Sequence, residues 1–229
     1  MSVVEVDLGA TRASIPFDLE RPAGDTPVRG AIAVAHGAGS GREQPLLVAF
    51  AQTLREAGLV TLRFDFAYRA AGRRMPGPAA HAIVAWSAVL RELRGAAPGV
   101  PIVAAGKSYG GRMASMAAAE GAIDPDALVY LGYPLHPPGK PESPRIAHLP
   151  GISAPQLFLA GTKDPFLQPL EQFEQAVASC QRAEIVWTDG GGHSFEVAGA
   201  KRSPDQIGRD LAAAVADRLV AAGVMPPAS

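Results

Sequence analysis

The chain has 229 residues, 48% of them hydrophobic and 19% charged, which is enough apolar material for a sizeable buried core. Its formal net charge of −1 argues against an overall basic surface for nucleic acid and against an acidic tail. The single cysteine, Cys180, excludes an intrachain disulfide, and no apolar run of about 20 residues predicts a membrane span. The first residues lack the pattern of a secretory signal, so we expect one domain over residues 1–229, located in the cytoplasm.

The N-terminal third begins with residues 2–20, whose alternating polar and apolar side chains predict an edge hairpin. An apolar strand near 30–36 follows and leads into the loop His36-Gly37-Ala38-Gly39-Ser40-Gly41. Glycines let such a backbone turn an N–H group toward a ligand. We then expect a helix near 44–57 and a strand over 59–66.

An arginine-rich loop follows that strand and contains Tyr68, Arg69, Arg73 and Arg74. Guanidinium groups match carboxylates and phosphates, so these four residues are candidate substrate contacts. A solvated or internally ion-paired loop is an equally good interpretation. The next helix, near 79–94, carries a buried stripe formed by Ile83, Trp86, Leu90 and Leu93.

The most informative segment is Gly106-Lys107-Ser108-Tyr109-Gly110, between an apolar strand at 101–105 and a helix that extends to about 120. A serine with glycines two positions away on either side, between strand and helix, indicates a nucleophile elbow. A phosphate-binding P-loop needs a flexible glycine-rich loop before Gly-Lys-Ser, but Pro101 and an apolar strand stand there. A chance match in a chain with 25 glycines is the remaining alternative.

An activated serine needs a histidine base and an acid, which follow in the order Ser, Asp or Glu, His in proteins with this elbow. We expect His193, after three glycines, to be the base and Asp164, at the end of a strand over 156–161, to be the acid. Asp189 is the reserve acid. The other downstream histidines, His136 and His148, lie in a proline-rich segment over 134–150 that suits a short lid and lacks metal-ligand spacing.

Two backbone N–H groups are expected to form an oxyanion hole, one from Tyr109 and one from Ala38. Gly37 and Gly39 are the alternatives for the second donor. His36 precedes the elbow, so we expect it to hold the loop rather than to act as a base.

The remaining pattern alternates strands and helices to the end of the chain, which predicts an α/β fold with a mostly parallel sheet covered on both faces. A strand is expected near 127–132, a helix near 169–179 and a strand over 183–187. The last helix opens with a capping box at Ser203-Pro204-Asp205-Gln206. Its buried face comprises Ile207, Leu211, Val215 and Leu219.

The whole chain resembles the α/β-hydrolase superfamily, in particular its dienelactone hydrolase-like branch. More narrowly, it is similar to the testis-expressed hydrolase-like proteins and to the hydrolase-like subunit of a histone-acetyltransferase complex. The blocks that carry the resemblance are His36-Gly37-Ala38-Gly39, Arg63-Phe64-Asp65-Phe66 with Tyr68-Arg69 and Gly72-Arg73-Arg74, Gly106-Lys107-Ser108-Tyr109-Gly110-Gly111-Arg112, Leu131-Gly132-Tyr133-Pro134-Leu135-His136-Pro137-Pro138-Gly139, Gly161-Thr162-Lys163-Asp164 and Gly191-Gly192-His193-Ser194-Phe195.

The resemblance implies a sheet of about eight strands, a triad at Ser108, Asp164 and His193, and no cofactor, and the spacing of His136 and His148 predicts no metal site. Dienelactone hydrolases use a cysteine nucleophile, whereas this chain has Ser108, so their substrate is not implied. The short connections leave no room for a large cap domain.

These observations predict a carboxylesterase- or thioesterase-like serine hydrolase that cleaves small esters or thioesters through an acyl-enzyme on Ser108. If the arginine-rich loop contacts the substrate, the substrate is expected to carry a negative charge. We expect a monomer or a small homo-oligomer that binds neither nucleic acid nor membranes. The alternative is a non-catalytic binding or scaffold module with the same fold.

Overall fold

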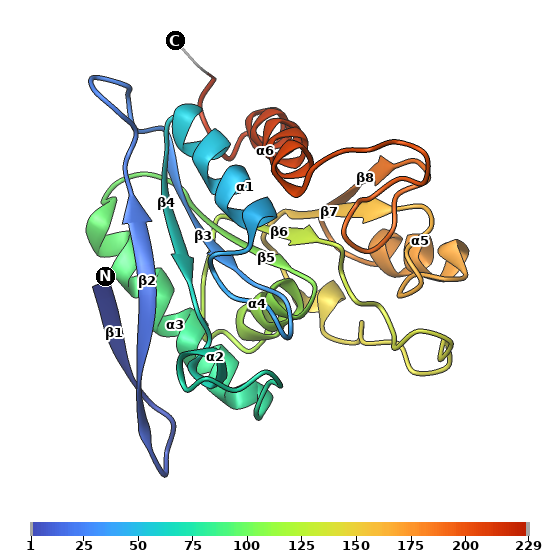
Figure 1. The fold of residues 1–229 in the computed structure, drawn as a ribbon, viewed down its shortest axis with the longest axis horizontal. Coiled ribbons are helices and arrows are strands. Elements are labelled where there is room, and N and C mark those ends of the chain that lie inside the picture. Colours follow the sequence, from blue (N-terminus) through green and yellow to red (C-terminus); the bar gives the residue numbers. More distant parts are fainter. Residues whose placement is uncertain (1, 228–229) are drawn as a thin grey trace.

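The computed structural model describes residues 2–227, and its centre is an eight-stranded sheet (Figure 1). The order across the sheet is β1-β2-β4-β3-β5-β6-β7-β8. The β1–β2 and β2–β4 pairs are antiparallel, whereas all other neighbours run parallel. The strands are β1 (Ser2–Asp7), β2 (Arg12–Glu20), β3 (Gly30–Ala35), β4 (Leu59–Phe64), β5 (Ile102–Lys107), β6 (Ala127–Leu131), β7 (Gln156–Gly161) and β8 (Ala183–Thr188).

Helices cover both faces of this sheet, as the alternating sequence pattern predicts. Side chains of α1 and α6 pack on one face, and those of α3, α4 and α5 pack on the other (Figure 1). Strand β3 serves both layers, because Ile32 and Val34 point toward α1 and α6 whereas Ala31 and Ala33 point the other way. The helices are α1 (Pro45–Glu56), α2 (Ala67–Ala70), α3 (Ala79–Ala96), α4 (Tyr109–Ala119), α5 (Leu170–Ala178) and α6 (Pro204–Ala221).

Several local predictions are confirmed in detail. Residues 2–20 form the edge hairpin β1–β2. Helix α6 begins with a complete capping box, in which Ser203 N donates to Gln206 Oε1 and Gln206 N donates to Ser203 Oγ. The expected stripes of α3 and α6 are buried.

Two short helices lie in segments that were expected to be irregular: α2 within the arginine-rich loop and a 3-10 helix at Leu149–Gly151 within the proline-rich segment. Segments of three or four residues are too short to carry a helical period, so the sequence gives no signal for them. Strand β4 ends at Phe64, two residues earlier than expected.

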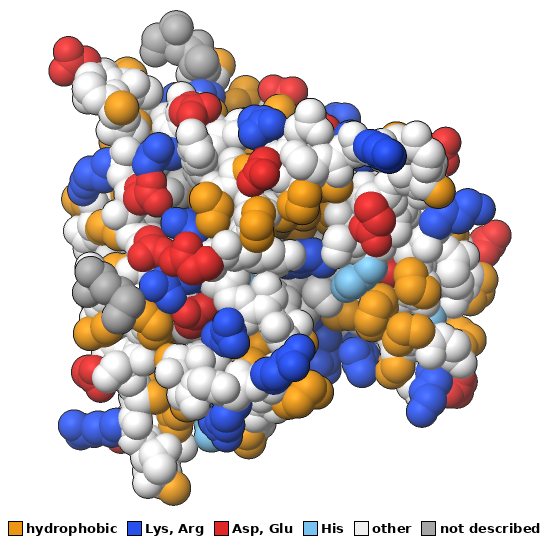
Figure 2. Space-filling view, viewed as in Figure 1, with side chains coloured by type: hydrophobic (Ala, Val, Ile, Leu, Met, Phe, Trp, Pro, Cys, Tyr) orange, Lys and Arg blue, Asp and Glu red, His pale blue; other side chains and the backbone are white. Residues whose placement is uncertain are grey.

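The fold is an α/β-hydrolase fold in which no large cap domain is present among residues 2–227. On the face shown in Figure 2, acidic and basic side chains lie interspersed, and neither sign forms one broad patch. In the part of the chain that the structure describes, no helix is both long and apolar enough to cross a membrane.

Candidate active site

Ser108 lies at the tip of a sharp turn between β5 and α4, with φ 49° and ψ −114°. This is a strained conformation for a residue with a side chain. The flanking glycines permit the turn: a Cβ on Gly106 would overlap with the amide nitrogen of Gly111, and one on Gly110 would lie 2.6 Å from the carbonyl oxygen of His36. The structure therefore explains why both positions of the predicted elbow are glycine.

His193 connects Ser108 to Asp164 through two hydrogen bonds. Its Nε2 lies 2.9 Å from Ser108 Oγ, and its Nδ1 lies 2.7 Å from Asp164 Oδ2. A carboxylate only accepts hydrogen bonds, so Nδ1 carries the proton and Nε2 accepts from the serine hydroxyl. The structure thus brings the three predicted residues together, although Ser108 and His193 are 85 positions apart in the chain.

Asp164 is fully buried, and its second oxygen, Oδ1, accepts a hydrogen bond from the Phe166 amide at 2.9 Å. These contacts fix the carboxylate in orientation. The reserve acid, Asp189, instead accepts a hydrogen bond from Thr162 Oγ1 at 3.2 Å. Asp164 is therefore the acid that contacts His193.

Three contacts position the loop that carries His193. A Cβ on Gly161 would overlap with the carbonyl oxygen of Gly191, so this loop can approach the end of β7 only because residue 161 is glycine. The ring of Phe166 lies against the imidazole with 4.2 Å between centroids. Lys107 Nζ donates to the carbonyl oxygen of His193 at 3.3 Å.

Lys107 is a buried cation next to the nucleophile, a feature that the sequence analysis did not single out. Burial lowers the pKa of Lys107 to about 8, and the negative charges of Asp164 and Glu196 oppose that decrease. The ammonium group is thus retained near neutral pH at a cost in folding free energy.

The two predicted oxyanion donors come from separate segments, the start of α4 and the loop after β3. Tyr109 is the first residue of α4, where a helix supplies no acceptor for the amide. Ala38 lies in the loop after β3 and, like Ser108, lines an open cleft of about 330 Å³. The cleft is lined by Gly37, Ala38, Ser40, Gln44, Lys107, Ser108, Phe166, His193 and Ser194.

His36 is fully buried and holds this loop in place. Its Nδ1 lies 2.8 Å from the carbonyl oxygen of Gly37, and its Nε2 accepts from the amide of Phe66 at 3.2 Å. Burial is the main cause that lowers the pKa of His36, which agrees with a neutral ring in these two hydrogen bonds.

An ion-pair network that the sequence analysis missed also anchors the loop. Asp65, just beyond β4, accepts from the amide of Arg42 at 2.8 Å and from its guanidinium at 2.6 Å. Arg42 also contacts Asp18 of β2 at 3.0 Å. Asp65 stands in one of the blocks that carry the family resemblance, and that block was the only available signal.

The candidate substrate contacts of the arginine-rich loop are not brought to the cleft beside Ser108. Tyr68 is buried against Phe66 and Tyr109, whereas Arg69, Arg73 and Arg74 are exposed. Their proposed contact with substrate stays a prediction.

The two histidines of the proline-rich segment have separate partners. His148 Nε2 lies 2.7 Å from Ser115 Oγ, and His136 Nδ1 lies 2.8 Å from the carbonyl oxygen of Pro137. Among residues 2–227, no group of three His, Cys, Asp or Glu side chains is placed to hold a metal ion.

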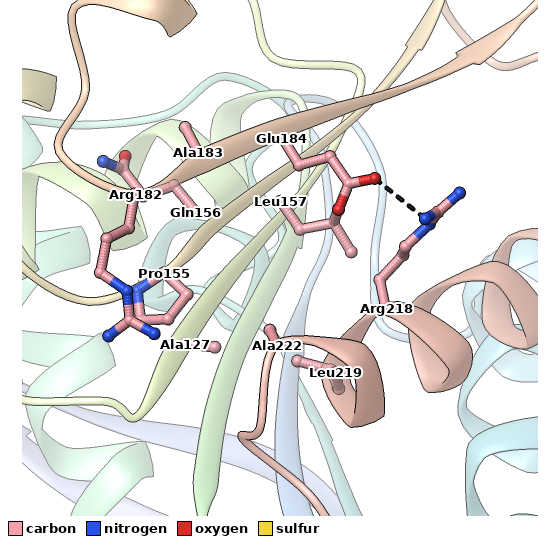
Figure 3. Close-up of a pocket in the computed structure, with 10 residues that line it drawn as sticks. All are labelled: Ala127, Pro155, Gln156, Leu157, Arg182, Ala183, Glu184, Arg218, Leu219 and Ala222. Atoms are coloured by element: carbon pink, nitrogen blue, oxygen red, sulfur yellow. Dashed lines mark ion pairs between the residues drawn. The ribbon is translucent and has the colours of Figure 1, made fainter.

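A second, mostly apolar pocket of about 190 Å³ lies at the amino ends of β6, β7 and β8, beside the end of α6 (Figure 3). Arg218 forms an ion pair with Glu184 at 3.1 Å on one of its walls. Ser108 lies at the carboxyl end of β5, so this pocket is at the opposite end of the strands from the triad residues.

A mostly parallel sheet with an elbow serine, followed along the chain by an aspartate and a histidine at strand ends, defines the α/β-hydrolase class of proteins. Residues 28–221 match the alpha/beta hydrolase domain family, and the chain belongs to this family.

Solved structures show the same fold. An alpha/beta serine hydrolase without lid from Xanthomonas campestris has a TM-score of 0.72 and 19% identity, with 100% of this chain and 96% of that chain covered. Thermogutta terrifontis esterase 2, phosphorylated by paraoxon, has a TM-score of 0.73 and 20% identity, with 99% and 95% covered. A dienelactone hydrolase from Anabaena variabilis has a TM-score of 0.63 and 23% identity, with 96% of each chain covered.

Proposed function

We propose that this protein is a serine hydrolase that cleaves small esters or thioesters through an acyl-enzyme on Ser108. The observation that carries the proposal is the continuous hydrogen-bonded chain from Ser108 through His193 to Asp164. Membership in the alpha/beta hydrolase domain family and the esterase structures of the same fold support it.

In the first step, Ser108 Oγ attacks the carbonyl carbon while His193 Nε2 takes the hydroxyl proton. Asp164 holds the imidazole with Nδ1 protonated and stabilises the imidazolium that forms. When the tetrahedral intermediate collapses, the bond to the alcohol or thiol breaks, and His193 returns the proton to the leaving group. Water then attacks the acyl-enzyme with His193 again as the base, and the acid is released.

The negative oxygen of each tetrahedral intermediate is assigned to the amides of Tyr109 and Ala38. A preorganised donor of this kind contributes roughly 3 kcal/mol to transition-state stabilisation in acyl-transfer enzymes. The contacts of His36 and the Arg42–Asp65 ion pair anchor the loop that contains Ala38, which supports the assignment of a preorganised donor there.

The open cleft and the absence of a large cap domain among the described residues favour small esters and thioesters. The closer relationship to the dienelactone hydrolase-like branch is also part of this proposal. This relationship rests on the sequence blocks quoted above and on the similar fold. The nucleophile differs, since dienelactone hydrolases use a cysteine and this chain has Ser108.

The test is labelling with a fluorophosphonate probe, read by intact and peptide mass. We expect one adduct on the peptide that contains Ser108, its loss in Ser108→Ala, and its retention in Ser87→Ala, a control on α3. Hydrolysis of short-chain esters and thioesters should follow the same pattern. Absence of an adduct on folded protein would contradict the proposal and favour a binding or scaffold module.

A further inference from the structure

Helix α4 carries a second cationic group one turn beyond the nucleophile. The amide of Arg112 donates to the carbonyl oxygen of Ser108 at 3.0 Å, so the two residues lie on the same side of the helix. Arg112 also shares the partly exposed side of α4 with Tyr109 and Met116, whereas the residues between them are largely buried. This side of the helix therefore leads away from Ser108.

The segment that follows β6 lies next to this side of α4. Tyr133 OH donates to the carbonyl oxygen of Arg145 at 2.7 Å, and the amide of Arg145 donates to the carbonyl oxygen of Leu135 at 2.7 Å. Further along the segment, His148 contacts Ser115 of α4. The backbone of Arg145 is thus fixed by two hydrogen bonds, one from the Tyr133 hydroxyl and one to the carbonyl oxygen of Leu135.

Arg112 differs from Arg42 and Arg63, two other poorly exposed arginines, in having no carboxylate partner among residues 2–227. Arg63 lies 3.3 Å from Glu20 and Arg42 lies 2.6 Å from Asp65, with side chains that are only 8% and 13% exposed. Among residues 2–227, neither Arg112 nor Arg145 forms an ion pair, and Arg112 Nε is buried with no hydrogen-bond partner. A buried donor without a partner destabilises the folded protein.

The titratable groups that act on Arg112, namely Arg145, Tyr109 and Tyr133, carry no negative charge at neutral pH. Burial is the main cause that lowers the pKa of Arg112, and the nearby Arg145 lowers it further. The neighbouring phenols stay protonated, because burial raises the pKa of both Tyr109 and Tyr133 to about 12. His148 stays neutral at pH 7, since burial and Arg112 lower its pKa to about 4.

We propose that Arg112, one helical turn along α4 from Ser108, and Arg145 form an anion subsite outside the cleft of about 330 Å³, and that the substrates are esters or thioesters carrying a second, anionic group such as a carboxylate. The proposal rests on the serine hydrolase function above and specifies its substrate class. An anion there would give the buried Arg112 Nε–H its missing acceptor and would balance two adjacent cations. These are different residues from the exposed arginines of the loop over 66–76.

The test compares two esters of the same length: the para-nitrophenyl monoester of glutaric acid, which has a free carboxylate, and para-nitrophenyl pentanoate, which is neutral. For the wild-type protein we expect a higher kcat/KM on the anionic ester. Arg112→Gln and Arg145→Gln should each lower that preference by roughly 10- to 100-fold, the value of a lost charge-assisted hydrogen bond. Arg112→Lys should restore part of it, and Arg91→Gln, an exposed arginine of α3, should leave it unchanged.

A second measurement separates the two proposals. Glutarate alone should raise the Tm of wild-type protein and Arg91→Gln but not that of Arg112→Gln, whether or not either ester is hydrolysed. If both esters are hydrolysed with a preference that Arg112→Gln does not change, the anion subsite is wrong and the hydrolase function stands. If neither ester is hydrolysed and Ser108 is not labelled, the hydrolase function fails. In that case, glutarate stabilisation that depends on Arg112 would still support the anion subsite, and its absence would overturn it.

Discussion

Replacement of Lys107 by methionine is expected to stabilise the protein at neutral pH while slowing ester hydrolysis. Lys107 is almost fully buried next to the nucleophile, and burial lowers its pKa from 10.5 to about 8. A charged ammonium is therefore less stable in the folded protein than in the unfolded chain. Methionine has a similar length and no charge, so it removes this cost and keeps the packing.

The expected magnitude follows from the two pKa values. Each pKa unit corresponds to about 1.4 kcal/mol, so the charge of Lys107 destabilises the folded state by about 3 kcal/mol at pH 7. The variant also loses the hydrogen bond from Nζ to the carbonyl oxygen of His193, which contributes about 1 kcal/mol. We therefore expect a net increase of about 2 kcal/mol in the free energy of unfolding.

The pH dependence distinguishes this cause from better packing. Between pH 8 and 10.5 the unfolded chain holds the Lys107 proton more tightly than the folded protein does, so wild-type stability rises with pH in this window. The difference in free energy of unfolding between Lys107→Met and wild type should therefore be constant below about pH 8 and should shrink toward pH 10.5.

Urea unfolding at several pH values, followed by circular dichroism, measures this difference, with the exposed Lys163→Met as the control. Loss of the contact with His193 should also loosen the base and lower kcat. A Lys107→Met protein that is no more stable than wild type at pH 7, or whose advantage does not change up to pH 10.5, would refute the reasoning.

Three further predictions concern the site and its supports. Asp164→Asn should lower kcat for ester hydrolysis by roughly 10⁴, because an amide does not hold His193 in the productive tautomer; a normal rate would exclude Asp164 as the acid. Gly110→Ala should lower the free energy of unfolding by about 3 kcal/mol through its clash with His36. Gly95→Ala on α3, where a Cβ meets no atom within 4 Å, should instead raise it by up to about 1 kcal/mol in the same urea experiment. Wild-type stability should fall as the pH drops from 6.5 to 4, because the unfolded chain protonates His148 before the folded protein does. After allowance for solvent screening we expect about 1 kcal/mol, which His148→Gln should remove.

Most of the fold was predictable from the sequence because its signals are local. A strand or helix shows its period within a few residues, and the capping box of Ser203 and Gln206 spans only four. The nucleophile elbow is also local, since Gly106 and Gly110 are required by the turn that contains Ser108. The partners of Ser108 could be inferred because parallel strands present their carboxyl ends at one edge of the sheet.

Other predictions from the sequence have not been tested by the fold. The single-domain organisation, the cytoplasmic location and the oligomeric state stay predictions. The same holds for the catalytic roles of the triad residues and for the choice of Ala38 as oxyanion donor.

Only the tertiary structure decided which charges are buried and with what partners. Lys107 is one residue of an apolar strand end, and its burial against the His193 loop arises from a contact between positions 86 residues apart. Arg42 meets Asp65 across 23 residues, and Arg112 and Arg145 come together only because the segment after β6 lies next to α4. A periodic pattern records which face of one element is apolar, whereas these pairs depend on how separate elements pack, and that geometry leaves no local signature in the sequence.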